Sequence, residues 1–395
     1  YTHGSGANSK ALELAGITRE TPDPPGGHIK KDKNGEPTGE FVERAPSQLT
    51  RLIPPLPPMT DYEISRNLVE GTQLAIASGL TTIHGASVTG YDEIQRRLKL
   101  YEVGLLRIRI NEMVSEAAAK KLGQPLNYEN KFFIRSVKTL ADGALGSRGA
   151  HFLEEYSDYP DYCGEPRLNE DEIAQSATEL LKIGFNMRIH CIGDAANRTA
   201  ITAYERALKA TGLNGNNVRF ALEHCQVLTP EDIPRLAELG IVASMQPLHA
   251  IEDMHFAEAR IGPERLKHAY IWSDLLDLGV VVATGTDYSV SPYNPFYTLH
   301  AAVTRQDRDN NPPGGWFPEQ AMTREEALRA ATMGGAYVMF AEDILGSIEV
   351  GKLADFVVIP VDYMTFPAED IWKIQPEMTV IGGEVVYTKP VSAQK

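Results

Sequence analysis

From residue 61 onward, the chain alternates between two spacings of apolar residues. Segments such as ISRNLVEGTQLAIASG (64–79) place apolar residues three and four positions apart and end at glycine, as amphipathic helices do. Each helical segment is followed by a short apolar run, such as GLTTIHGA (79–86), which is typical of a buried strand. Seven strands alternate with helices in this way, so the pattern predicts an α/β fold in which helices cover a parallel sheet.

The two ends of the chain have different patterns. Residues 1–60 are rich in Pro, Gly and Thr, which predicts turns and a hairpin at Asn34-Gly35. Residues 345–395 contain short strand-like runs with tight turns and no long helix between them. We therefore divide the chain into a loop-rich insertion (1–60), a barrel (61–344) and a C-terminal β portion (345–395). Seven strands are one fewer than the eight of a closed (β/α)₈ barrel, so we expect one barrel strand to be missing.

Three of the apolar strand-like runs stop at a residue that can bind a metal ion. They are GFNMRIHCIGD, which leads to His190, VRFALEHCQ, which leads to His224, and GVVVATGTD, which ends at Asp287. A lone histidine at a strand end is more often structural than a ligand. Three such residues at the same position on separate strands, however, meet at the carboxyl edge of a parallel sheet, where barrel enzymes place their chemistry. Two imidazoles and a carboxylate suit Zn²⁺ or a similar divalent cation.

Composition narrows the classes of partner. The 395 residues are 43% hydrophobic and 23% charged, as in ordinary globular proteins, and the net charge of −15 argues against binding to nucleic acid or to anionic membranes. No apolar run approaches the roughly 20 residues that span a bilayer. The three cysteines have no CxxC spacing, so a reducing cytoplasm is the expected location. The chain starts without Met or a leader pattern, and we expect it to be part of a longer polypeptide.

Seven stretches, in order along nearly the whole chain, resemble the amidohydrolase superfamily and within it amidohydrolase family 3, which includes N-substituted formamide deformylase-like enzymes. They are NSKALELAGITRETPDPPGG, KTLADGALGSRGA, IHCIGDAAN, LEHCQ, ASMQPLHAIED, TGTDYSV and GSIEVGKLADFVVI. The resemblance implies a distorted (β/α)₈ barrel, a small β-sandwich and metal-dependent hydrolysis of C–N bonds.

The resemblance also implies roles for particular residues. His190, His224 and Asp287 match family ligands at the ends of barrel strands 5, 6 and 8, and the aspartate also moves protons. Lys138 matches a strand-4 lysine that is carboxylated to bridge two metal ions in some members; the alternative is a lysine paired with a carboxylate or with solvent. Family members carry a His-x-His pair on strand 1, and no such pair occurs in this sequence. We therefore interpret the chain as truncated at the front of the barrel.

Three further residues are candidates for contact with substrate. Arg148, after strand 4, can hold a substrate carboxylate in a bidentate grip, or it can anchor a loop. Gln246 and His249 follow strand 7 on the same edge, and for His249 a structural role is an equal alternative.

The sequence thus predicts a hydrolase that cleaves a non-peptide, amide-type C–N bond in a small molecule by means of water activated by one or two Zn²⁺ or similar ions. Asp287 is the expected proton carrier. Two alternatives stay open: an inactive scaffold or binding homologue, and an ester or phosphoester hydrolase on the same fold. A homo-oligomer is a further expectation. The chain has neither a GxSxG elbow nor a P-loop.

Overall fold

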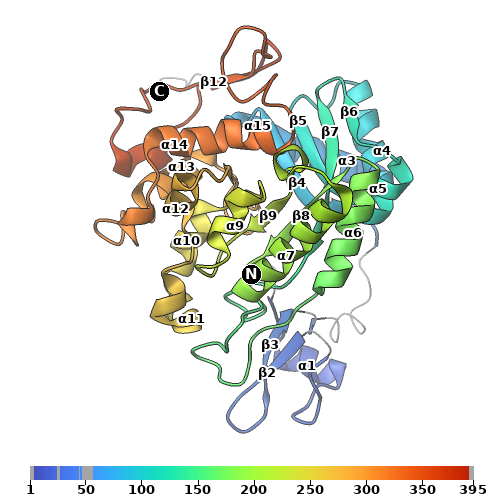
Figure 1. Ribbon diagram of the computed structural model, residues 1–395, viewed down its shortest axis with the longest axis vertical. Coiled ribbons are helices and arrows are strands. Elements are labelled where there is room, and N and C mark those ends of the chain that lie inside the picture. The colour runs from blue at the N-terminus through green and yellow to red at the C-terminus, as the bar shows by residue number, and fades with distance from the viewer. Residues whose placement is uncertain (1–3, 25–26, 44, 47–56, 391–395) are drawn as a thin grey trace.

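The computed structural model describes residues 4–24, 27–43, 45–46 and 57–390. Its centre is a curled sheet in which seven parallel strands follow the order β11-β10-β9-β8-β7-β5-β4 (Figure 1). An eighth strand, β6 (Leu126–Tyr128), pairs antiparallel with β7. The seven parallel strands are β4 (Thr82–Thr89), β5 (Arg109–Val114), β7 (Phe132–Leu140), β8 (Asn186–Cys191), β9 (Ala221–His224), β10 (Val242–Met245) and β11 (Val282–Thr284). This half-barrel confirms the predicted barrel-type α/β fold.

Helices connect the strands and cover the outside of the sheet (Figure 1). Asn169, with Glu172 three residues later, predicts the N-terminal cap of the helix before β8. The structure confirms it, because Asn169 Oδ1 accepts from Glu172 N while the Glu172 carboxylate accepts from Asn169 N. The helices of this part are α3 (Asp61–Ala77), α4 (Tyr91–Glu102), α5 (Glu116–Leu122), α6 (Glu170–Lys182), α7 (Asp194–Thr211), α8 (Gly215–Val218), α9 (Ile233–Glu238), α10 (Pro247–Asp253), α11 (Ala257–Leu266), α12 (Trp272–Asp277), α13 (Pro295–Thr304), α14 (Arg324–Arg329) and α15 (Gly335–Val338), with 3₁₀ helices η1 (Pro318–Gln320) and η3 (Ala368–Lys373) and a π turn η2 (Ala330–Gly334).

Side chains of each strand alternate between the helices and the interior of the half-barrel. In β8, Ile189 and Cys191 are fully buried in the main apolar core with the helices. Arg188 faces the interior instead, where its guanidinium meets Glu223 of β9. The interior of the half-barrel is therefore polar, and the apolar core lies between sheet and helices.

The described strands do not close into a barrel, since β4 and β11 form the two edges of the sheet. The π turn η2 lies in this seam. A Cβ on Gly334 would come within 2.4 Å of the carbonyl oxygen of Val282 in β11, and one on Gly335 would lie 3.8 Å from Nε2 of His84 in β4. Glycine at position 334 thus allows a helical backbone to approach a strand edge that has no neighbouring strand.

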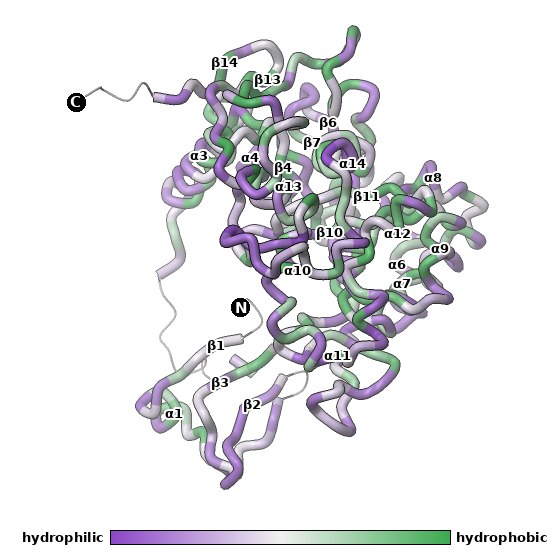
Figure 2. Tube along the Cα trace, turned by 90° about the vertical axis from the view of Figure 1, so that its left-hand side faces the viewer, coloured by the Kyte–Doolittle hydropathy of each residue, from purple (hydrophilic) through white to green (hydrophobic). Residues whose placement is uncertain are grey.

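Two small antiparallel sheets lie at opposite ends of the molecule (Figure 2). The first has the order β1-β3-β2 and contains the predicted hairpin, whose turn is held by Asp32 Oδ1, which accepts from Asn34 N and Glu36 N. The second has the order β12-β13-β14 and forms the predicted C-terminal β portion. Their elements are β1 (Gly4–Gly6), α1 (Ser9–Ala15), β2 (Gly27–Lys31) and β3 (Pro37–Glu43), and then β12 (Phe356–Val358), β13 (Met378–Ile381) and β14 (Glu384–Thr388).

Four described residues of the N-terminal segment build a separate apolar core. These are Ile17, Ile29, Phe41 and Ala45. His28 also contacts the barrel part through Tyr162 Oη, 2.9 Å from its Nε2. The division of the chain at residues 60 and 344 stays a prediction. Within the described ranges, none of the helices has the length and apolar character needed to cross a membrane.

Candidate metal centre

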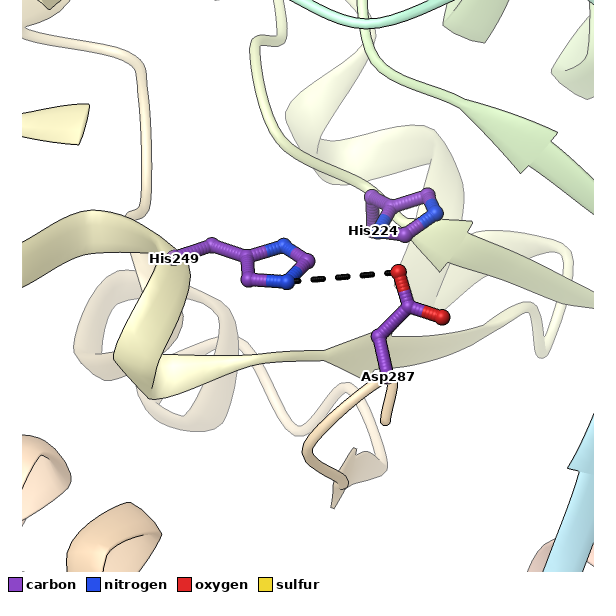
Figure 3. Close-up of side chains that lie close together, drawn as sticks. All are labelled: His224, His249 and Asp287. Atoms are coloured by element: carbon purple, nitrogen blue, oxygen red, sulfur yellow. Dashed lines mark ion pairs between the residues drawn. The ribbon is translucent and has the colours of Figure 1, made fainter. Parts of the chain in front are cut away.

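Three side chains at the carboxyl edge of the sheet bring potential ligand atoms together. In the part of the chain that the structure describes, His224, His249 and Asp287 each offer one such atom, and these atoms lie within 4.8 Å of one another (Figure 3). His224 ends β9, His249 lies in α10 directly after β10, and Asp287 follows β11. Since β9, β10 and β11 are neighbours in the sheet, the three residues come from one continuous stretch of its edge.

The backbone at two of these residues departs from strand geometry. Glu223 faces the interior, so regular alternation would turn His224 towards the helices. His224 instead has φ of 75°, which directs its ring to the same side. Asp287 has φ of 53° and lies three residues after β11 ends at Thr284. Positive φ is uncommon outside glycine and clusters at functional sites.

A glutamine holds the ring of His224. Nδ1 of His224 lies 2.7 Å from Oε1 of Gln246, and Nε2 of Gln246 donates to the carbonyl oxygen of Ser244 at 3.2 Å. Both His224 and Gln246 are buried. Burial lowers the pKa of His224 below its ordinary value, which favours the neutral imidazole that binds metal ions.

His249 supplies the observation that tests whether a metal ion fits here. Its Nε2 is buried without a hydrogen-bond partner among the described residues and lies 3.9 Å from Oδ2 of Asp287 (Figure 3). Buried polar atoms are normally paired, so an orphan nitrogen that faces a carboxylate and a second imidazole requires an explanation. Burial, and then the neighbouring His224, lower the pKa of His249 to about 4, so its ring is neutral. Two neutral imidazoles and a carboxylate are a suitable donor set for a divalent cation.

His190 lies beside this group without belonging to it. Its ring packs edge-on against that of His224 with 4.5 Å between the centroids. Its Nε2 is 3.2 Å from the carbonyl oxygen of Gly143 and 3.5 Å from Oδ1 of Asp142, on the loop after β7. The structure therefore brings His190 and His224 together, but it does not place His190 in the three-ligand cluster, and its role as a ligand stays a prediction.

Lys138 of β7 lies inside the half-barrel and is 8% exposed. Burial lowers its pKa, while the charges of Glu223 and Asp287 oppose that shift. Burial would raise the pKa of Glu223, but Arg188 and Lys138 outweigh it and lower that pKa to about 2. Lys138 is thus buried where the charges of Glu223 and Asp287 act on it, and both its place at the metal ions and its carboxylation stay predictions.

The predicted substrate contacts have other partners in the structure. Nε and Nη2 of Arg148 pair with the two carboxylate oxygens of Asp158 at 3.0 and 2.8 Å, which favours the loop-anchor alternative for Arg148. Gln246 binds His224, and His249 joins the ligand cluster. The sequence signal for both is their spacing, because Pro247 begins α10 and so places residues 246 and 249 on the first turn of a helix at the strand end.

Comparisons with known proteins agree with this architecture. A model of the amidohydrolase family matches residues 1–387. Protein LONG AFTER FAR-RED 3 of Arabidopsis thaliana is 31% identical over 98% of this chain and 67% of its own length. N-substituted formamide deformylase of Arthrobacter pascens is 27% identical over 98% of this chain and 72% of its own length. The crystal structure of an uncharacterized metal-dependent hydrolase from Pyrococcus furiosus has a TM-score of 0.72 and 27% identity, and the match covers 92% of this chain and 71% of that one.

The family match extends over nearly the whole chain and includes the strand ends that carry the ligand cluster. It confirms the resemblance that the sequence motifs indicate. The chain belongs to the amidohydrolase family.

Proposed function

We propose that the chain is a metal-dependent hydrolase that cleaves an amide-type C–N bond in a small molecule. The observation that carries this proposal is the convergence of His224, His249 and Asp287 at the carboxyl edge of the sheet in a member of the amidohydrolase family. A relative named N-substituted formamide deformylase supports a non-peptide amide as the substrate class.

We expect Zn²⁺ or a similar divalent cation, held by His224, Asp287 and a third residue of this edge. The resemblance names His190 as that third ligand, whereas the geometry favours His249. When bound, such a cation polarises a carbonyl oxygen and lowers the pKa of a water molecule. The charges of Glu223 and Asp287 act on the buried Lys138, which supports a role for its ammonium group, or for a carboxylated side chain, at the same site.

Asp287 is the residue placed to move protons. Its side chain is 36% exposed, whereas His224 and His249 are buried, so substrate reaches the cluster from the side of the carboxylate. A carboxylate oxygen of Asp287 takes a proton from the attacking water as the new C–O bond forms. The same proton then passes to the nitrogen as the C–N bond breaks, which yields a carboxylic acid and an amine.

The proposal is tested by assaying the purified chain against N-substituted formamides, other amides, carboxylic esters and phosphoesters, before and after chelation and return of Zn²⁺. We expect amide-type substrates alone to be hydrolysed, and only with metal present. Asp287→Asn should reduce kcat by about 10²–10⁴-fold, because removing a general base typically costs that much. Hydrolysis of esters or phosphoesters alone supports the divergent-hydrolase alternative, and inactivity of the metal-loaded chain on all four classes supports the scaffold alternative.

A further inference from the structure

Arg305 differs from the other buried arginines of the described chain in having no counter-ion. Three arginines there are buried, namely Arg109, Arg188 and Arg305. Arg109 pairs with Asp355 at 2.7 Å, and Arg188 pairs with Glu223 at 2.6 Å. Arg305 is 0% exposed, yet no carboxylate in the described ranges forms an ion pair with it. Buried charges are normally paired, so this guanidinium requires another form of compensation.

Neutral groups compensate part of the charge. Arg305 directly follows α13, and its Nε and Nη1 donate to the carbonyl oxygens of Trp316 at 2.7 Å and of Tyr270 at 3.0 Å. Its Cζ also lies 4.2 Å from the ring centroid of Trp272 and 5.5 Å from that of Trp316. Carbonyl dipoles and aromatic faces stabilise a cation, but they carry no net negative charge that would neutralise it.

Two hydrogen-bond donors at this place have no acceptor. Nη2 of Arg305 is buried and unpartnered in the part of the chain that the structure describes, and the same is true of Nε1 of Trp272. Trp272, which begins α12, is also 0% exposed. Because the guanidinium lies over the indole, the two unpartnered N–H groups belong to touching side chains. Both atoms can only donate, so neither can satisfy the other.

The charge of Arg305 determines which kind of acceptor suits these donors. Burial lowers the pKa of Arg305 to about 10, and Tyr270 and the exposed Glu319 oppose that shift. The guanidinium is therefore protonated at neutral pH. An acceptor beside it faces one positive charge in an aromatic surrounding. A divalent anion would leave a surplus negative charge and would cost more to dehydrate, whereas a monovalent halide matches one guanidinium.

We propose that Arg305 and Trp272 form a binding site for one chloride ion, which accepts from Nη2 of Arg305 and from Nε1 of Trp272. Bromide, which has the same charge, is an equivalent ligand. Neither residue belongs to the candidate metal centre, so the site is separate from the proposed catalytic chemistry. Its two donors are 33 positions apart in the sequence and meet only in the folded chain. A halide that binds there therefore stabilises the folded state as its concentration rises.

Crystals of the full chain transferred into sodium bromide test the site directly, because bromide gives an anomalous signal that a water molecule lacks. We expect an anomalous peak within hydrogen-bonding distance of Arg305 Nη2 and Trp272 Nε1. The peak should vanish when crystals are returned to sodium gluconate, whose anion is too large for a buried halide site. Bromide peaks confined to the protein surface would overturn the proposal.

Urea unfolding of the full chain measures the same binding in solution. Chloride replaces gluconate at constant ionic strength, so that general charge screening stays the same. Arg305→Gln removes the positive charge, and Trp272→Phe removes the indole N–H while it keeps an aromatic ring. Trp316→Phe is the matched control, because it changes the other ring against the same guanidinium and leaves both donors of the proposed site in place.

We expect chloride and bromide to raise the unfolding midpoint of the wild type and of Trp316→Phe to the same extent. The response should be lost in Arg305→Gln. Trp272→Phe should need at least about 10-fold more chloride for the same shift, which corresponds to losing one hydrogen bond to a charged group. An equal chloride response in the wild type and in Trp272→Phe would overturn the proposal. If Arg305→Gln does not fold, this comparison and the bromide peak still decide.

Discussion

At the scale of single residues, the helix that carries His249 also carries a buried acid outside the candidate metal centre. Oδ2 of Asp253, in α10, accepts from Tyr270 Oη at 2.6 Å and from Gln226 Nε2 at 3.2 Å. Burial raises the pKa of Asp253 to about 7, and the charge of Glu252 adds to that shift. The hydrogen bonds therefore hold the group in place without making its ionisation favourable.

Asp253→Asn should make the stability of the folded chain less sensitive to rising pH. Between about pH 4 and pH 7 the folded protein keeps a proton on Asp253 that the unfolded chain releases, so this group lowers stability as the pH rises through that window. Asparagine accepts the same two hydrogen bonds and does not ionise. With about 1.4 kcal/mol for each pKa unit, the variant should gain roughly 2–4 kcal/mol over the wild type at pH 8 compared with pH 4.

The measurement is urea unfolding of both proteins across this pH range, with Asp277→Asn as a control at an exposed position. The difference between variant and wild type isolates Asp253 from the other buried acids. A difference that is the same at pH 4 and pH 8 would contradict the raised pKa.

At the scale of elements, the seam between β11 and β4 depends on the close approach of η2. Gly334→Ala should destabilise the chain by about 1–3 kcal/mol, because the new Cβ meets the Val282 carbonyl at 2.4 Å and the backbone must shift. Gly71→Ala is the matched control: Gly71 also lies in a helix, α3, but a Cβ there meets nothing within 4 Å. That control should gain up to about 1 kcal/mol from helix propensity alone.

Denaturant unfolding of Gly334→Ala and Gly71→Ala distinguishes the steric effect of the new Cβ from the effect of helix propensity on stability. Equal stabilisation by both substitutions would show that η2 does not press on the strand edge in solution.

The elements also show how far sequence reasoning extends. The helix–strand alternation, the parallel sheet and the cap at Asn169 follow from local spacing, and the structure confirms them. The strand expected to end at Asp287 ends at Thr284. The spacing of REEALRAATMGGAYVM (324–339) predicts one continuous helix, but this segment contains a π turn. Such departures depend on neighbouring elements, which a hydrophobic period does not describe.

The candidate metal centre could be predicted only in part, because its geometry also depends on contacts between neighbouring elements. Strand-end position identified His224 and Asp287, but the inward turn of His224 arises from a positive φ. The approach of His249 requires α10 to begin immediately after β10, so that a residue of its first turn lies at the same sheet edge as His224 and Asp287. A residue contributed by a helix start is therefore harder to find than one at a strand end.

At the scale of the whole molecule, two ion pairs connect the C-terminal sheet to the barrel part in contrasting surroundings. Arg109 of β5 and Asp355, just before β12, form a buried bidentate pair with distances of 2.7 and 2.8 Å, and Oδ1 of Asp355 also accepts from Gly382 N. Arg107 and Glu384 of β14 form an exposed pair at 3.4 Å. One buried and one exposed ion pair thus connect the C-terminal sheet to the barrel part.

Asp355→Ala should destabilise the chain by about 3–5 kcal/mol, because it leaves the guanidinium of Arg109 buried without its counter-ion. Glu384→Gln, between the same parts, should cost at most about 1 kcal/mol, since exposed pairs are screened by water. Unfolding in urea gives the two free energies, and limited proteolysis reports whether the C-terminal sheet detaches before the barrel part unfolds. We expect early cleavage near β12 in Asp355→Ala alone. Similar losses in both variants would mean that the buried pair contributes no more than a surface contact.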